Sequence, residues 1–127
     1  MTVHLDTSIL VDALSDRTSV RRLAAVAERG DRMQITSLVL FEWLRGPRSP
    51  EEVALCEALF PPESVVPFGE TEARLGALLY RSLPRARTRQ VDLAIAACAL
   101  ERGAAIWTLN PGDFQDVPQL KIYQPVS

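Results

Sequence analysis

The chain has 127 residues, of which 47% are hydrophobic and 24% charged, so it has enough apolar material for one hydrophobic core. No apolar run reaches the roughly 20 residues that a membrane-spanning helix needs, and the formal net charge of −2 is not that of a strongly basic nucleic-acid-binding protein. Because the first residues carry no basic segment typical of a secretory signal, we expect a single cytoplasmic domain over residues 1–127.

The first part of the chain predicts strands that alternate with helices. In chain order, we expect a strand, two helices and a second strand, over residues 2–6, 9–14, 19–29 and 33–36. Ser37 is expected to cap the next helix, over residues 38–45.

The second part continues the alternation. Ser49 and Glu52 have the spacing of a capping box, which predicts a helix that runs to about residue 59. Further on, we expect a β-like stretch, an amphipathic helix, a charged loop, an apolar helix and two strands, over residues 64–67, 69–82, 85–89, 90–102, 104–108 and 120–123. In the amphipathic helix Leu75, Leu78 and Leu79 should point inward. The chain between strands is usually helical in pattern, so we predict an α/β fold with a parallel sheet and helices on both faces.

The cysteines and the histidine do not form a recognisable zinc-binding pattern. Cys56 and Cys98 are expected to be buried free thiols. His4 is the only histidine, and it is expected to pack or to form a local hydrogen bond in the first strand.

Three carboxylates each stand alone in an apolar stretch: Asp6, Glu42 and Asp92. Burying an unpaired carboxylate is unfavourable, so three in such segments indicate a shared cation. The predicted elements can bring all three to the carboxyl ends of parallel strands, where the active sites of open sheets lie.

A polar cluster after the strand over 104–108 can complete this site, and its members are Thr108, Asn110 and Asp113. Ligands that offer only oxygen atoms favour Mg²⁺ or Mn²⁺. A metal held by carboxylates can activate water for phosphodiester cleavage, so the pattern favours hydrolysis of nucleic acid.

Each acid also has a purely structural alternative. Asp6 could cap the helix that follows it, and Asp92 could complement a helix dipole. Glu42 could face solvent from one side of its helix, and Asp113 could be a turn residue. Their joint occurrence at predicted element ends and in apolar faces favours a common site.

Arginine dominates the basic residues: only Lys121 of the 14 is a lysine. Arg81, Arg85, Arg87 and Arg89 fall within nine positions just before the helix that carries Asp92. Arginine binds phosphate in a bidentate manner, so these side chains are candidates for nucleic-acid contacts. A solvated charged linker is the alternative, and the sequence leaves both open.

Four segments resemble, in order and spacing, the motifs of PIN-domain ribonucleases, most of all the VapC-type toxins of bacterial toxin–antitoxin pairs. The segments are VHLDTSILVDAL, TSLVLFEWLRG, QVDLAIAACAL and AAIWTLNPGDF. The resemblance implies a PIN-like three-layer sandwich around a mostly parallel, twisted sheet. It also implies a ribonuclease that uses Mg²⁺ or Mn²⁺ and hydrolyses RNA phosphodiester bonds.

The same resemblance implies roles for individual residues. Asp6, Glu42 and Asp92 match the three main acids of the family, and Asp113 is assigned to the fourth acidic position. Asn110 is a neighbour that can bind water or metal, and Thr7 or Ser8 matches the hydroxyl that orients the first acid. The loop at Pro111-Gly112 departs from the family pattern and puts the geometry of Asp113 in question. For RNA contacts, the candidates are Arg85, Arg87 and Arg89.

A toxin of this kind implies an antitoxin partner, and a homodimer through a helical face in the C-terminal half is also expected. Apolar stripes on the helices over 19–29 and 51–59 suggest a groove for an amphipathic antitoxin helix; they consist of Val20, Leu23 and Val26, and of Val53, Leu55 and Leu59. The alternative is that both stripes face the protein's own sheet.

Other functions remain to be weighed against a toxin. A housekeeping PIN nuclease in RNA processing is one, and a PIN fold that binds without cutting is another. A receiver-like signalling domain would need paired acids after the first strand and a lysine after the last. A haloacid-dehalogenase-type phosphatase would need a second acid two residues after Asp6, where Ser8 stands.

Overall fold

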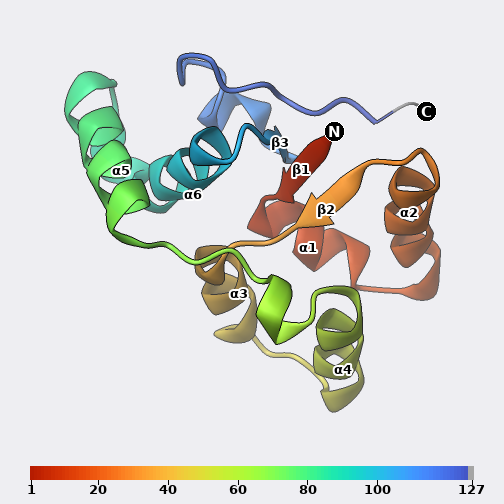
Figure 1. The fold of residues 1–127 in the computed structure, drawn as a ribbon. Coiled ribbons are helices and arrows are strands. Elements are labelled where there is room, and N and C mark those ends of the chain that lie inside the picture. The colour runs from red at the N-terminus through yellow and green to blue at the C-terminus, as the bar shows by residue number, and fades with distance from the viewer. Residues whose placement is uncertain (126–127) are drawn as a thin grey trace.

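A parallel sheet of three short strands lies at the centre of the computed structural model, which describes residues 1–125 (Figure 1). The strands are β1 (Thr2–Leu5), β2 (Arg32–Gln34) and β3 (Ala105–Trp107), and β1 lies between the other two. Leu5 pairs with Trp107 in parallel register, so β1 and β3 end at the same edge of the sheet. Whatever follows these strands is therefore brought together at that edge.

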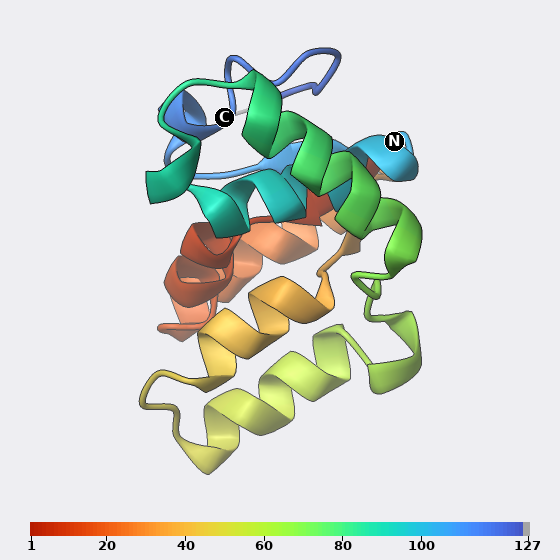
Figure 2. The same ribbon diagram turned by 90° about the vertical axis from the view of Figure 1, so that its left-hand side faces the viewer.

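Within the described residues six α-helices surround the sheet; two 3-10 turns lie between helices, and a third follows β3. The α-helices are α1 (Thr7–Ala13), α2 (Arg17–Glu28), α3 (Ser37–Leu44), α4 (Pro50–Leu59), α5 (Glu70–Ser82) and α6 (Gln90–Glu101). The 3-10 turns are η1 (Pro62–Ser64), η2 (Ala86–Thr88) and η3 (Pro111–Asp113). Figure 2 shows α5 and α6 on one side of the sheet and α1, α2 and α3 on the other, which confirms the predicted layered α/β fold.

The core forms around β1 and β3, whose side chains are mostly apolar and buried. Val3, Leu5 and Ile106 have no exposed surface, as expected for strands covered by helices on both sides. Small residues let the covering helices approach closely: a Cβ atom added to Gly76 of α5 would lie 3.8 Å from Cα of Ala94 in α6. This close contact of α5 with α6 leaves a shallow groove between the two helices.

The helix starts agree with the sequence in one case and differ in another. Ser49 caps α4, and the reciprocal bond from the backbone N–H of Ser49 to Glu52 Oε1 (2.9 Å) completes the predicted capping box. At α3, however, the cap is Thr36, whose Oγ1 accepts from the N–H of Val39 at 3.1 Å, so the prediction of Ser37 is wrong by one residue. The Ser37 hydroxyl instead accepts from the N–H of Phe68.

The segments over 120–123 and 64–67, predicted as a strand and a β-like stretch, each form only a single β-bridge. Ile122 forms one parallel bridge with Ile106, and the chain reaches it after Gln119, whose φ of 66° bends the backbone out of extended geometry. Val66 forms one parallel bridge with Thr36. The expected loop over 85–89 contains the turn η2.

Two predictions about buried faces need correction. Leu78 was expected to point inward but is 51% exposed, because α5 contacts the core through Leu75 and Leu79 and turns Leu78 outward. The α2 stripe is not free for a partner, because Leu23 and Val26 are buried in the protein's own core.

The predictions for the two cysteines and the histidine are confirmed. Cys56 and Cys98 are buried free thiols. His4 has no exposed surface, its Nε2 lies 3.2 Å from Gln34 Oε1, and burial lowers its pKa to about 4. No helix among residues 1–125 has the length and apolar character to cross a bilayer.

Candidate active site

Asp6 stands where β1 turns into α1, and its carboxylate points toward the end of β3. The residue is buried, and its backbone N–H donates to the carbonyl of Trp107 at 2.8 Å. Oδ2 accepts from the hydroxyls of Ser8 (2.9 Å) and Thr108 (2.8 Å). Among the described residues no side-chain capping bond joins Asp6 to α1, so a capping role does not account for this acid.

Ser8 and Thr108 join the ends of β1 and β3. Besides contacting Asp6, the Ser8 hydroxyl accepts from the N–H of Leu109, and the Thr108 hydroxyl accepts from the N–H of Asn110, each at 3.0 Å. The network fixes one oxygen of Asp6 and holds the loop after β3 against it. The Asn110 residue itself is exposed at this rim.

Glu42 reaches the same region from α3. Its Oε1 accepts from the Thr7 hydroxyl at 2.6 Å, and its side chain is only 20% exposed. Arg45 lies one turn further along, with Nη2 at 3.8 Å from Oε2. Glu42 therefore faces inward toward α1, which excludes the alternative of an acid that simply points to solvent.

Asp92 shows that the acids share one electrostatic environment. Its pKa rises to about 6, first because burial penalises the carboxylate and then because Asp6, Asp113 and Glu42 repel its charge. Arg89 acts in the opposite direction with a smaller effect. Four acids, from the β1–α1 junction, α3, α6 and η3, thus lie near enough to influence one carboxyl group, and the repulsion between them is larger than the effect of Arg89 on Asp92.

The donor set fits a hard divalent cation that keeps part of its water shell. No three Asp, Glu, His or Cys side chains within residues 1–125 converge closely enough to hold an ion by themselves. Mg²⁺ commonly binds only one or two carboxylates directly and retains several waters, so this spacing suits it better than it suits a closed protein cage. Carboxylate, hydroxyl and amide oxygens are also the ligands that Mg²⁺ and Mn²⁺ prefer.

A cavity of about 370 Å³ opens beside two of the acids. Glu42 and Asp92 line it together with Arg87, Gln90 and the turn that connects them. Arg87 is exposed, so its guanidinium is available at the mouth of the cavity. This position next to the acids is compatible with a phosphate contact.

Arg89 does not fit the predicted role in RNA binding. Its side chain is 3% exposed, and its two terminal nitrogens each donate to Asp116 at 2.6 Å. They also donate to the backbone carbonyls of Asp113 and Pro84. The guanidinium therefore links η3 to the start of α6, and Arg89 is not available for contacts with RNA.

Sequence reasoning missed Asp116 and the part that it plays. The residue lies in an irregular segment between Phe114 and Val117, both of which are buried, and nothing in the local pattern indicates its partner. Arg45 beside Glu42 was also missed, although a spacing of three residues on a helix could have suggested the pair.

Comparisons with known proteins agree with this geometry. The family model for the PIN domain matches residues 3–120. Ribonuclease VapC19 from Mycobacterium tuberculosis (strain ATCC 25618 / H37Rv) is 36% identical over 121 residues, which cover 92% of this chain and 95% of that relative.

Solved structures at lower identity show the same fold. VapBC2 from Rickettsia felis, bound to a DNA fragment from its promoter, matches with a TM-score of 0.76 at 20% identity over 97% of this chain and 98% of that chain. DNA-bound VapBC from Salmonella typhimurium matches with a TM-score of 0.72 at 24% identity over 97% of each chain.

Proposed function

The chain belongs to the PIN-domain family, within it to the VapC ribonucleases, and from this membership we propose that it is a metal-dependent endoribonuclease that serves as the toxin of a toxin–antitoxin pair. The observation that carries the proposal is that Glu42 and Asp92 line one cavity, while Asp6 lies at the edge of the sheet with Thr108 and the charges of Asp6, Asp113 and Glu42 all act on Asp92. Family membership sets aside the receiver-domain and phosphatase alternatives.

The acids and the hydroxyl groups of the site have different proposed roles. Asp6, Glu42, Asp92 and Asp113 would surround Mg²⁺ or Mn²⁺, one or two of them by direct bonds and the others through its waters; when bound, the ion supplies an activated water and offsets charge on the reacting phosphate. The Ser8 and Thr108 hydroxyls leave Oδ1 as the free oxygen of Asp6, because both donate to Oδ2.

Thr7 and Asn110 support the same site from its two sides. Thr7 donates to Glu42 Oε1 and so leaves Oε2 for other contacts. Asn110 is exposed at the rim, where its amide can bind water or a metal-bound group.

RNA is the proposed substrate, and Arg85 and Arg87 are its proposed phosphate contacts. Both are exposed, and Arg87 lines the cavity that Glu42 and Asp92 also line. Exposed guanidinium groups next to a cluster of acids can hold the phosphate backbone, which the acids alone would repel.

An antitoxin helix is proposed to bind between α3 and α4. An apolar groove of about 330 Å³ lies there, and Leu40, Leu44 and Val53 are among the side chains that line it. This location replaces the predicted groove on the α2 stripe. Glu42 lies on the other face of α3, toward α1, so a partner in this groove would need a further segment that passes around the helix to place a basic residue near the acids.

The test is cleavage of single-stranded RNA with Mg²⁺ or Mn²⁺ by the wild type and by the Asp6→Asn and Asp92→Asn variants. We expect the wild type to cut, the chelated protein to be inactive and both variants to lose at least about 100-fold in rate. Glu101→Gln, at the exposed far end of the same helix as Asp92, is the matched control and should keep full activity. Full activity in the Asp6→Asn/Asp92→Asn double variant would refute the proposal.

Growth of the host cell separates a toxin from a housekeeping nuclease. Expression of the wild type alone should arrest growth. Co-expression of the small protein encoded by the neighbouring gene should restore growth, and the two proteins should co-purify. A protein that cuts RNA in vitro but does not slow growth would make the housekeeping function the better account.

A further inference from the structure

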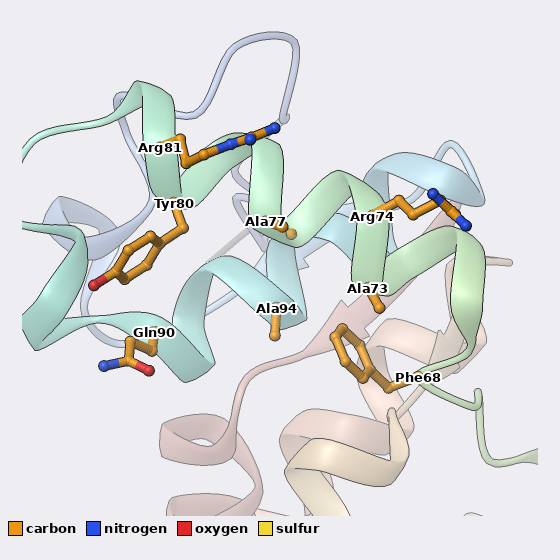
Figure 3. Close-up of a pocket in the computed structure, with 9 residues that line it drawn as sticks. Phe68, Ala73, Arg74, Ala77, Tyr80, Arg81, Gln90 and Ala94 are labelled. Carbon is orange, nitrogen blue, oxygen red and sulfur yellow. The ribbon is translucent and has the colours of Figure 1, made fainter.

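A groove with a volume of about 590 Å³ lies between α5 and α6, outside the acid cluster (Figure 3). Ala73 and Ala77 of α5 and Ala94 of α6 form its floor, where small side chains keep the surface flat. Within the part of the chain that the structure describes, no acidic residue lines it.

Two exposed aromatic rings lie at opposite ends of this floor. Figure 3 shows Phe68 beside Ala73 and Tyr80 beside Gln90. Phe68 is 36% exposed and Tyr80 is 40% exposed. Ala73 and Tyr80 are two helical turns apart, or roughly 10 Å, a span that can accommodate one or two nucleotides. Exposed rings over a flat floor are what unpaired bases stack on.

The charge of the groove favours a polyanion over a second copy of the chain. Arg81 is exposed and forms no ion pair with any residue in 1–125, and Arg74 is paired only with the exposed Glu70 (3.0 Å). A two-fold contact between copies on this face would bring the same unneutralised arginine from each copy together. A phosphate backbone would neutralise both.

The groove is continuous with the candidate active site. Gln90, in the first turn of α6, lines both the groove and the cavity that holds Glu42 and Asp92. Arg87 also lines that cavity. A strand of RNA that leaves the acids over Gln90 would therefore enter the groove directly.

We propose that this groove binds unpaired nucleotides of the substrate next to the cleavage site, with bases stacked on Tyr80 and Phe68 and phosphates held by Arg81 and Arg74. The inference rests on the proposed ribonuclease function and adds a binding surface for the nucleotides next to the scissile bond. A paired helix cannot offer free base faces to these rings, so the groove would select against it.

The experiment measures RNA affinity in the Asp92→Asn background, where binding does not depend on cleavage. The probes are a single-stranded RNA of about 12 nucleotides and a blunt duplex of the same sequence. We expect Tyr80→Ala to weaken single-strand binding about 10-fold, Tyr80→Phe to retain it, and duplex binding to be unchanged by either. Leu78→Ala is the matched control, because Leu78 is exposed on α5 but lies outside the groove, and it should have no effect.

Two outcomes would overturn the proposal. One is equal single-strand affinity in Tyr80→Ala, Phe68→Ala and their parent. The other outcome has two parts: light scattering shows that the parent is a dimer and Tyr80→Ala a monomer, and the loss of RNA affinity disappears when parent and variant are compared as monomers. The groove would then be a contact between copies. If the wild type fails to cleave RNA but Tyr80-dependent binding is found, the groove stands and the nuclease function fails.

Discussion

Opposing effects act on the carboxyl group of Asp92. It lies in the first turn of α6, where the helix dipole favours a negative charge by about 0.3–1 kcal/mol. Its pKa nevertheless rises to about 6 from 3.8, a change worth up to about 3 kcal/mol, because burial and the repulsion of Asp6, Asp113 and Glu42 are larger. The dipole alternative suggested by the sequence is therefore the weaker effect, and the proposed cation would offset the larger, unfavourable one.

The first prediction concerns Asp92→Asn and its dependence on pH. A carboxyl whose pKa is raised by folding stabilises the protein below its unfolded pKa of about 4 and loses that contribution as pH rises through 6. Without metal, the variant should therefore exceed the wild type by about 1–2 kcal/mol of unfolding free energy at pH 7.5 and match it near pH 4; the value is reduced for partial exposure.

Urea unfolding in a chelating buffer across this pH range measures the difference. Glu101→Gln serves as the control and should show no such pH-dependent gain. A difference that stays constant from pH 4 to 7.5 would mean that ionisation of Asp92 is not its cause.

The second prediction concerns Arg89, which the structure reassigns from RNA binding to folding. Arg89→Ala removes a bidentate pair and leaves Asp116 and two carbonyls without their donor, so we expect a loss of about 2–3 kcal/mol in unfolding free energy. Arg87→Ala, two residues away and exposed, should change it by less than about 0.5 kcal/mol. Equal thermal unfolding of the two variants would contradict the assignment.

At the scale of elements, the sequence predicted those whose pattern is local. The capping box of α4 depends on residues three positions apart, and the apolar character of α6 needs no partner to be recognised. The segment over 120–123 was predicted less well, because pairing with β3 depends on how the chain arrives after Gln119. Leu78 was misplaced because the sequence does not show that α5 packs on small residues of α6.

The third prediction concerns the turn η2 as a positively charged element. In the Asp92→Asn background, Arg85→Ala/Arg87→Ala should reduce the slope of log affinity for RNA against log salt by about 1–2 units. The reason is that RNA binding releases fewer counterions when fewer phosphates are contacted. Arg17→Ala/Arg21→Ala, on the exposed face of α2, is the control with the same loss of charge. Identical slopes in both double variants would indicate a general charge effect instead of a contact.

At the scale of the whole molecule, the parallel sheet explains why the predicted acids meet. β1 and β3 pair in register, so the residues that follow Leu5 and Trp107 are brought to one edge, and the hydroxyls of Ser8 and Thr108 both reach Asp6. This much could be inferred from strand ends in the sequence. The position of Glu42 against Thr7 and the burial of Arg89 could not, because each depends on contacts between elements far apart in the chain.

The central claim is that the four acids hold one catalytic metal site, and a crystal soaked in Mn²⁺ tests it most directly. The account predicts an anomalous peak at the edge of the sheet, within roughly 2 Å of a carboxylate oxygen of Asp6 or Asp92, and no such peak in Asp92→Asn. It would be contradicted by a saturating soak that leaves this edge without a peak, or that places Mn²⁺ only on carboxylates elsewhere on the protein.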